Sequence, residues 1–442
     1  MAETSSLLNC RYRKVSTGSN PVLSANLDDS FSVVFFLFAE STGFELQRVI
    51  ISRKTFSYRE HLDFFTIFVT AKQNYLNMKQ IFKTIAIVAA VAIFGTQSLY
   101  AAIKCQYVDA STLTVINKAQ ENDPVLQRLD PNKYEMPKGI RNAMKQSTGI
   151  AVLFTTDSRN IHAKWTTIGK RSCGSNMTPI FHSGLDLYIR ENGKWFFAGV
   201  ARPNINGSNE HEFTIAKKMA EGKKECMLYL PMFNGVSSLE IGIDEGATIE
   251  PLASTFKHRI FFVGSSITHG ASACRPGASY VARIGRMLDA ETPNIGVSGQ
   301  CKLNDFYADI VCDSKADAFV FDTFSNSTAS VIDERVYNFV KRVAEAHPNT
   351  PMIFLQTVKR DIGHFDLASR KRNDDQRAAA EKWMTQLCKE FKNVYFINPA
   401  FCIGEDGEGT IDGTHLNDLG VQRTIENLVP KMKKILKKYG IK

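Results

Sequence analysis

The chain has 442 residues, of which 44% are hydrophobic and 22% are charged, and its formal net charge is +9. Such proportions are those of a globular protein, and the length excludes a single ordinary domain. The positive charge does not indicate a nucleic acid partner. Five lysines lie within 431–438, at the end of a predicted amphipathic helix where the helix dipole favours cations, and no nucleic-acid motif is present.

An export signal begins at Met78. Two lysines follow closely, an apolar run covers 85–94, and small residues lie at 101–102. This layout is typical of a bacterial secretory signal, and the apolar run is about half of the roughly 20 residues that span a membrane. We expect residues 78–101 to be a signal peptide, and the mature protein to be periplasmic or extracellular with no stable membrane span. A retained membrane anchor is the alternative.

A signal at residue 78 makes the preceding segment unusual. We predict that residues 1–77 are a disordered, non-native upstream extension and that Met78 is the true start. A poorly ordered N-terminal extension of the native protein is the alternative.

Nine cysteines occur, eight of them after the signal, without the spacing of a CxxC or Cys/His metal site. Export would permit disulfides, although buried free thiols are common in protein cores. We predict no metal site and no cofactor.

Short alternating strands separated by turns predict a β-sandwich over residues 105–255. The turn Asn192-Gly193 joins two of them and is typical of a tight hairpin, because both residues must adopt positive φ. The expected strands are 150–155, 161–165, 185–190, 194–200, 226–230 and 239–243.

From residue 256 onward, strands alternate with helices. This order predicts a three-layer α/β/α domain with a parallel sheet over 256–442, whose reactive groups gather at the carboxyl ends of the strands. The expected strands are 259–263, 294–297, 318–321, 352–357 and 394–397, and the expected helices are 279–288, 331–346, 376–391 and 419–439, the last one kinked at Pro430.

Four polar segments stand at strand ends or before the last helix: GSSITHG at 264–270, GVSG at 296–299, DTFSN at 322–326 and DGTHLND at 412–418. A serine at a strand-to-helix turn exposes its hydroxyl and can offer its own N–H to an oxyanion. Each segment alone is typical of a turn or cap. Their joint order, each at the expected end of an element, favours a catalytic site.

This order resembles that of the SGNH/GDSL hydrolase superfamily, which has a flavodoxin-like fold. The resemblance covers 256–442 and implies that Ser266 is the nucleophile and that Asp412 and His415 are its charge-relay partners. It also implies an oxyanion hole formed by the backbone N–H groups of Ser266 and Gly299 and by the amide of Asn326.

The segment GLDLY at 184–188 resembles the GxDLY signature of the small domain that precedes such hydrolases in bacteria, and CRPG at 274–277 resembles a feature of the same subgroup. Two departures argue against a narrow substrate assignment. Ser265 replaces the aspartate of the GDSL motif, and the segment 322–326 lacks the usual glycine-x-asparagine form.

The residue types suit this chemistry, because a serine hydroxyl becomes a good nucleophile only when a base takes its proton. An imidazole such as that of His415 acts as this base near neutral pH, and Asp412 can accept the other ring N–H. His269, one turn from Ser266, is the alternative base, although no acidic residue near it in sequence would orient it.

The resemblance implies an exported serine esterase that hydrolyses acetyl or other short-chain esters, on carbohydrates or other acylated small molecules, through an acyl-serine intermediate. A lipase- or thioesterase-like acylhydrolase and a catalytically inactive glycan-binding protein are the alternatives. The charged segment 359–372 is expected to be either a solvated loop or a mobile rim that meets an anionic or sugar substrate. The substrate-binding residues are not indicated.

Overall fold

The computed structural model describes residues 105–169 and 173–441, together with four strands nearer the N-terminus. The chain divides into two compact units, 1–101 and 102–442, and each is considered by itself. Residues 78–101 lie outside the described residues, so the signal peptide stays a prediction. The upstream extension over 1–77 also stays a prediction, and only four strands within it are described. The strands of the first unit pair antiparallel and are β1 (Ser32–Phe35), β2 (Phe38–Ala39), β3 (Phe44–Lys54) and β4 (Phe64–Ala71).

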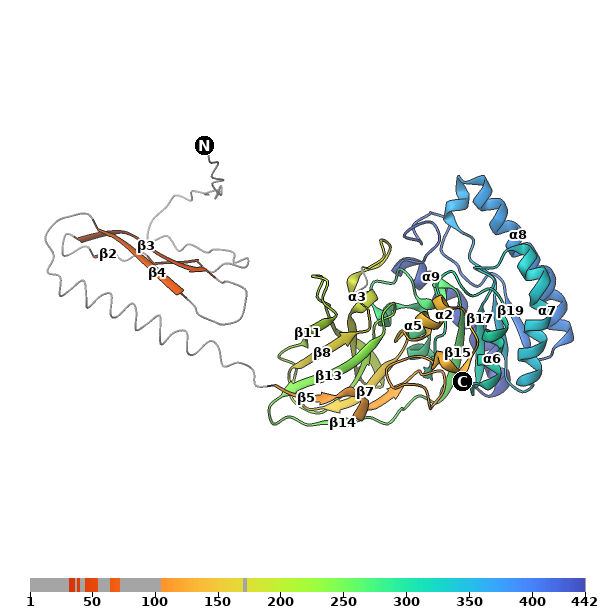
Figure 1. The fold of residues 1–442 in the computed structure, drawn as a ribbon, viewed down its shortest axis with the longest axis horizontal. Helices are drawn as coiled ribbons and strands as arrows, with labels where there is room; N and C mark the ends of the chain where they lie inside the picture. Colours follow the sequence, from red (N-terminus) through yellow and green to blue (C-terminus); the bar gives the residue numbers. More distant parts are fainter. Residues whose placement is uncertain are drawn as a thin grey trace. The chain divides into compact units, whose positions relative to one another are not determined.

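The second unit begins with an antiparallel β-sandwich (Figure 1). One sheet has the order β10-β9-β12-β7-β14, with β6 also paired to β7, and the other has the order β11-β8-β13-β5. All six expected strands are present. The bounds are β5 (Cys105–Asp109), β6 (Thr114–Ile116), β7 (Ala151–Thr156), β8 (Ile161–Thr167), β9 (Leu185–Glu191), β10 (Lys194–Ala201), β11 (Glu210–Ala216), β12 (Lys224–Tyr229), β13 (Val236–Asp244) and β14 (Ile249–Pro251).

The six-stranded sheet is covered on both faces, as β7 illustrates. Val152 and Phe154 point into the core between the two sheets, while Ala151 and Leu153 point to the opposite face. There they pack in one cluster with Ala282 of helix α5 (Tyr280–Leu288). A strand buried on both faces is hydrophobic at consecutive positions, which explains the run of four apolar residues that begins β7. The sandwich therefore packs directly on the α/β domain.

The C-terminal part is a parallel sheet in the order β16-β15-β17-β18-β19, with helices on both faces (Figure 1). Helices α6, α7 and α8 pack on one face, and α5 and α9 pack on the other. The expected three-layer architecture is confirmed. Its strands are β15 (His258–Gly264), β16 (Ala290–Glu291), β17 (Ala318–Asp322), β18 (Met352–Leu355) and β19 (Val394–Ile397), and its remaining helices are α4 (Ser266–His269), α6 (Asp305–Asp313), α7 (Ala329–Ala346), α8 (Leu367–Glu390) and α9 (Asp418–Leu436), which runs through Pro430.

The short helices complete the description of the second unit. They are the α-helices α2 (Lys138–Met144) and α3 (Pro179–Ser183) and the 3-10 helices η1 (Ala110–Thr112), η2 (Pro131–Lys133), η3 (Pro276–Ala278), η4 (Asp361–His364) and η5 (Lys437–Tyr439).

The expected strand over 294–297 is wrong. The segment forms a single bridge, between Phe262 and Asn294, and the edge strand of the sheet is β16. The outer side of this segment is covered by Arg128, whose guanidinium donates hydrogen bonds to the carbonyls of Asn294 (3.3 Å) and Gly296 (2.7 Å). Toward β15, the segment donates the backbone N–H groups of Ile295 to the Phe262 carbonyl and of Val297 to the Gly264 carbonyl, each at 2.9 Å. It therefore follows β15 without forming a regular strand, and Arg128 closes its outer edge.

The connection between β6 and β7 contributes to the α/β core. Leu129, Ile140 and Met144 are buried in the same cluster as Phe261 of β15 and Phe306 of α6. Part of the range expected to be sandwich therefore completes the hydrophobic core of the following domain.

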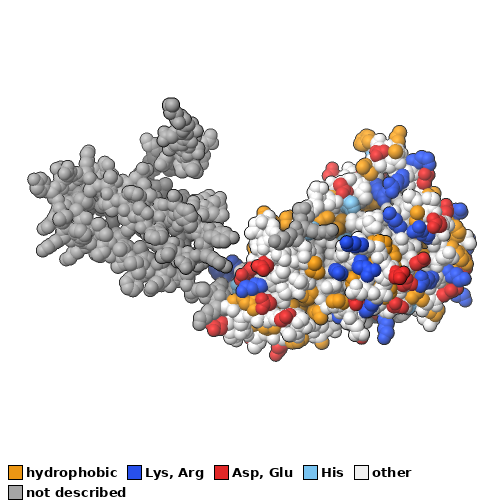
Figure 2. Space-filling model, viewed as in Figure 1, with side chains coloured by type: hydrophobic (Ala, Val, Ile, Leu, Met, Phe, Trp, Pro, Cys, Tyr) orange, Lys and Arg blue, Asp and Glu red, His pale blue; other side chains and the backbone are white. Residues whose placement is uncertain are grey.

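The charged segment 359–372 is more ordered than a solvated loop. It contains η4, and α8 begins at Leu367 because the Asp366 carboxylate accepts the backbone N–H of Ala368 at 3.0 Å. Phe365 is 89% exposed and Leu367 is 69% exposed. Figure 2 shows hydrophobic side chains at this end of α8, and Lys and Arg side chains interspersed with Asp and Glu over the α/β domain.

Two further properties concern the described residues alone. None of their helices is long and apolar enough to cross a membrane. All eight cysteines between 105 and 402 are free thiols.

Candidate active site

The turn from β15 into α4 places Ser266 at the carboxyl edge of the sheet. Ser265 caps the helix, because its hydroxyl accepts the backbone N–H of Ile267 at 3.1 Å. Gly264 permits the close approach of the turn, since a Cβ at this position would overlap the side chain of Thr268. Ser266 is therefore the first residue of α4, where its backbone N–H has no partner within the helix.

Ser266, His415 and Asp412 form one continuous chain of hydrogen bonds. Ser266 Oγ lies 2.8 Å from His415 Nε2, and His415 Nδ1 lies 2.7 Å from Asp412 Oδ2. A carboxylate only accepts, so Nδ1 carries the proton and Nε2 is free to accept the serine hydroxyl. Ser266 and His415 come from opposite ends of the α/β domain in the sequence and are 149 positions apart.

The Asp412 carboxylate is held by its own turn. Its Oδ1 accepts the backbone N–H groups of His415 (2.9 Å) and Thr414 (3.1 Å). Partial burial alone would raise the pKa of Asp412, but these hydrogen bonds, the ring of His415 and the side chain of Asn176 lower it to about 2. Asp412 is therefore ionised at neutral pH and can stabilise an imidazolium.

Gly299 and Asn326 lie at the same sheet edge as Ser266. Gly299 has a φ of +71°, and a Cβ built on it would meet no atom within 4 Å, so the space beside its backbone is open. Asn326 follows β17, the strand that pairs with β15, and its Oδ1 is buried without a hydrogen-bond partner among the described residues. Their roles as oxyanion donors stay predictions.

His269 is not placed to serve as the base. Its Nε2 donates to the carbonyl of Met232 at 2.8 Å, and its ring stacks on Phe233 with 3.7 Å between the centroids. It is 1% exposed, and burial holds its pKa well below the usual value. His269 is a neutral contact to the sandwich domain, so this alternative for the base does not hold.

Two polar residues near the site were assigned no role from the sequence. The first is Asn176, in the segment between β8 and α3, whose Nδ2 donates to Asp412 Oδ2 at 2.9 Å from 236 positions away. No local pattern indicates a contact over this separation.

The second is Asp322, the last residue of β17, which lies beside the nucleophile turn. Its Oδ2 accepts hydrogen bonds from the Ser265 hydroxyl and from Thr268 Oγ1 (3.1 Å), and its Oδ1 accepts one from Ser325 Oγ (2.5 Å). Burial raises the pKa of Asp322, and these hydroxyl donors oppose that effect. A carboxylate is thus present next to position 265 even though the GDSL aspartate is replaced, and it comes from the neighbouring strand.

The GxDLY and CRPG segments meet each other. Arg275 Nη1 donates to Asp186 Oδ2 at 2.8 Å and to Tyr188 Oη at 2.5 Å, and the backbone N–H of Gly277 donates to Asp186 Oδ2 at 2.8 Å. The Asp186 side chain is fully buried. We call this contact the Asp186–Arg275 clamp. It joins β9 of the sandwich to the segment that follows α4.

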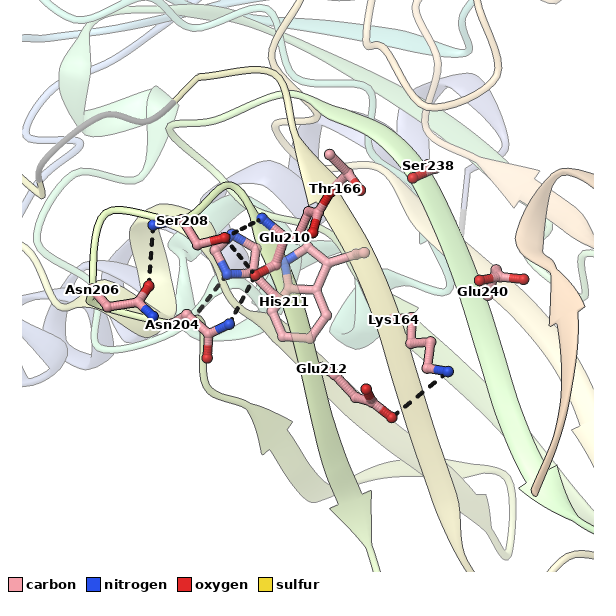
Figure 3. Close-up of a pocket in the computed structure, with 11 residues that line it drawn as sticks. Lys164, Thr166, Asn204, Asn206, Ser208, Glu210, His211, Glu212, Ser238 and Glu240 are labelled. Carbon is pink, nitrogen blue, oxygen red and sulfur yellow. Dashed lines mark hydrogen bonds and ion pairs between the residues drawn. The ribbon is translucent and has the colours of Figure 1, made fainter. Parts of the chain in front are cut away.

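A polar pocket of about 420 Å³ lies on the four-stranded sheet of the sandwich (Figure 3). Lys164 of β8 and Glu212 of β11 form an ion pair of 3.8 Å at its wall. The pocket contains none of the residues assigned to catalysis. Among the described residues, no group of His, Cys, Asp or Glu side chains is arranged to hold a metal ion.

The chain is similar to known proteins over both of these domains. Residues 257–433 match the GDSL-like lipase/acylhydrolase family, and residues 105–249 match the GxDLY N-terminal domain of SGNH-hydrolase-type esterases. A protein from Bacteroides ovatus ATCC 8483, assigned as a GDSL-like lipase, is 39% identical with a TM-score of 0.73, over 76% of this chain and 98% of that chain. No curated protein matches the sequence.

Two more distant structures show the shared fold. A salicylyl-acyltransferase from a tetracycline biosynthetic pathway is 20% identical, with a TM-score of 0.58 over 77% of this chain and 99% of its own. A family two carbohydrate esterase from Cellvibrio japonicus is 12% identical, with a TM-score of 0.50 over 76% and 98%. The matches over both domains and the identity to the Bacteroides protein show that the chain belongs to the GDSL-like lipase/acylhydrolase family of SGNH-type esterases and is a carboxylic ester hydrolase.

Proposed function

We propose that this protein is an exported serine esterase that removes acetyl or other short acyl groups from carbohydrates. The single observation that carries the catalytic part is the unbroken hydrogen-bonded chain from Ser266 Oγ through His415 to Asp412. A serine, an imidazole with its free nitrogen on the hydroxyl and a carboxylate on the other nitrogen are the parts that acyl transfer to serine requires.

In the first half-reaction, Ser266 Oγ attacks the ester carbonyl carbon while His415 Nε2 takes the hydroxyl proton. Asp412 stabilises the resulting imidazolium through Nδ1–H. The tetrahedral oxyanion would receive hydrogen bonds from the backbone N–H of Ser266 and Gly299 and from the Asn326 amide. Collapse breaks the bond to the alcohol oxygen, His415 returns the proton to that oxygen, and the acyl group stays on Ser266.

In the second half-reaction, water attacks the acyl-serine carbonyl and gives its proton to His415 Nε2. A second oxyanion forms at the same position. Its collapse breaks the bond to Ser266 Oγ, which recovers the proton from His415, and a carboxylic acid leaves. Ester and water are thereby converted to alcohol and acid without a cofactor.

The substrate class is supported less directly. This chain shares its two-domain arrangement with the family two carbohydrate esterase. We therefore propose that the substrate is a glycan that carries short acyl groups. The Cellvibrio protein and this chain share the order of both domains, since the alignment covers 98% of the former. Purified protein should therefore release acetate from acetylated oligosaccharides and cleave p-nitrophenyl acetate faster than p-nitrophenyl palmitate. Preference for the long chain would overturn this part in favour of a lipase-like enzyme.

The catalytic assignment is tested by Ser266→Ala, which removes only the attacking oxygen. We expect turnover of p-nitrophenyl acetate to fall to background while the melting temperature stays close to that of the wild type. Ser265→Ala, at the neighbouring hydroxyl, should lose less activity. Wild-type turnover in the Ser266 variant, or a larger loss at Ser265, would show that the wrong serine is assigned.

Export is proposed from the segment 78–101 alone. Mass spectrometry of the protein from its native host should find an N-terminus near Ala102 in the periplasmic or extracellular fraction. Peptides from residues 1–77 would contradict the start at Met78.

A further inference from the structure

The sandwich domain extends a segment to the catalytic turn. Asn176 lies in this segment, and its side-chain Nδ2 is 2.9 Å from Asp412 Oδ2. Its backbone carbonyl accepts the hydroxyl of Ser272 at 2.9 Å, and Thr178 Oγ1 donates to the carbonyl of Cys274 at 2.7 Å. The segment is therefore attached to the α/β domain at Asn176 itself and again two residues later.

The Asn176 amide completes the hydrogen bonding of the catalytic carboxylate. Asp412 Oδ1 already accepts two backbone N–H groups, and Oδ2 accepts the ring N–H of His415. With the Asn176 amide, each carboxylate oxygen accepts two donors, which matches its two lone pairs. Nδ2 also lies 3.4 Å from His415 Nδ1. Both nitrogens carry protons and do not bond to each other, so the Asn176 amide contacts both Asp412 and His415.

We propose that Asn176 is a positioning residue of the catalytic site, and that the sandwich domain thereby completes the active site rather than only flanking it. The amide prevents the Asp412 carboxylate from rotating away from His415, and it places the positive end of a dipole beside that carboxylate. The inference rests on the proposed function, in which Asp412 orients and stabilises the imidazole.

The same arrangement gives the GxDLY segment a place in catalysis. The backbone carbonyl of Asn176 accepts the hydroxyl of Ser272, which lies three residues before Arg275. The buried Asp186 carboxylate accepts a hydrogen bond from Arg275 at 2.8 Å. The Asp186–Arg275 clamp therefore fixes the part of the α/β domain on which the Asn176 segment lies. A motif in the sandwich and a residue at the catalytic turn are linked through one short stretch of chain.

Three variants test the role of Asn176. Asn176→Ala should lower kcat for p-nitrophenyl acetate roughly tenfold to a hundredfold, the rate equivalent of one lost hydrogen bond to a charged group, with KM changed less than about twofold. Asn176→Asp adds a negative charge beside the imidazole and favours its protonated form, so the acidic limb of the kcat/KM profile should move to higher pH. The control Ser175→Ala, at the exposed neighbour, should match the wild type in both readouts.

The variant Ser272→Ala provides a second, independent measurement. It removes the support of the Asn176 backbone and should lower kcat by less than Asn176→Ala does. Because both changes act through the same side chain, the double variant should resemble Asn176→Ala alone rather than the product of the two effects.

Several results would overturn the inference while leaving the proposed function intact. Wild-type kcat in Asn176→Ala, with an inactive Ser266→Ala, would show that the amide does not position the site. A kcat loss accompanied by a lower melting temperature, or an unmoved acidic limb in Asn176→Asp, would assign Asn176 a merely structural role. Activity retained by Ser266→Ala would instead refute the proposed function itself.

Discussion

At the scale of single residues, the position before the nucleophile illustrates how a motif can change while its chemistry is kept in place. Ser265 and Asp322 are fully or almost fully buried and in direct contact. Asp322 accepts three hydroxyl hydrogen bonds, and Thr268 and Ser325 supply two of them. A carboxylate at position 265 would be buried against the carboxylate of Asp322, so the serine there and the aspartate on β17 belong together.

This pairing predicts the outcome of a residue swap. Ser265→Asp alone should destabilise the fold by about 3 kcal/mol or more, because it buries two carboxylates in contact. The defect should shrink as the pH falls, since protonation of either carboxyl removes the repulsion. Adding Asp322→Ser should recover most of the lost free energy of unfolding, as measured by urea denaturation. Independent, additive effects of the two changes would contradict the pairing.

At the scale of elements, β9 is tied to the α/β domain by the Asp186–Arg275 clamp. Arg275→Met should destabilise the protein by about 3–5 kcal/mol, because it leaves a fully buried carboxylate without its charged partner. Guanidinium denaturation monitored by circular dichroism would measure this loss. As a matched control, Arg335→Met removes an exposed pair with Glu334 and should change stability by no more than about 0.5 kcal/mol. Equal effects of both substitutions would argue against the clamp.

At the scale of the whole molecule, each of the two domains within residues 102–442 contributes buried side chains to a cluster that it shares with the other domain. Leu129 and Met144 fill the core that contains Phe261, and Ala282 of α5 is buried under the sandwich. A fragment of residues 256–442 should therefore expose part of its core, whereas residues 102–442 should fold cooperatively. We expect sharp thermal unfolding and low binding of a hydrophobic dye for the fragment of residues 102–442, but not for the fragment of residues 256–442. A cooperatively folded and active 256–442 fragment would refute both this prediction and the role of Asn176.

The sequence alone determined the architecture and the order of the polar segments at the strand ends. Strand and helix periodicity, turn residues and helix caps act within a few residues of each other, so they can be identified from the chain itself. The same holds for Ser266 at the end of β15 and for Asp412 and His415 before α9, because each segment follows or precedes an element whose type is evident locally. The strand expected at 294–297 was the exception, because the segment forms one bridge to β15 and the side chain of Arg128 binds its outward carbonyls.

Only the tertiary structure decided which distant side chains complete these segments. Asn176 reaches Asp412 across 236 positions, Arg128 reaches Gly296 across 168, and Asp322 reaches Ser265 across 57. Each contact satisfies a polar group that is buried or half-buried, and that requirement arises only when distant elements pack together. A local pattern cannot record it, because the partner lies on another element. The core positions and the catalytic motifs therefore follow from short-range chemistry, whereas the supporting hydrogen bonds follow from how distant elements pack, within the α/β domain for Asp322 and against the sandwich for Asn176.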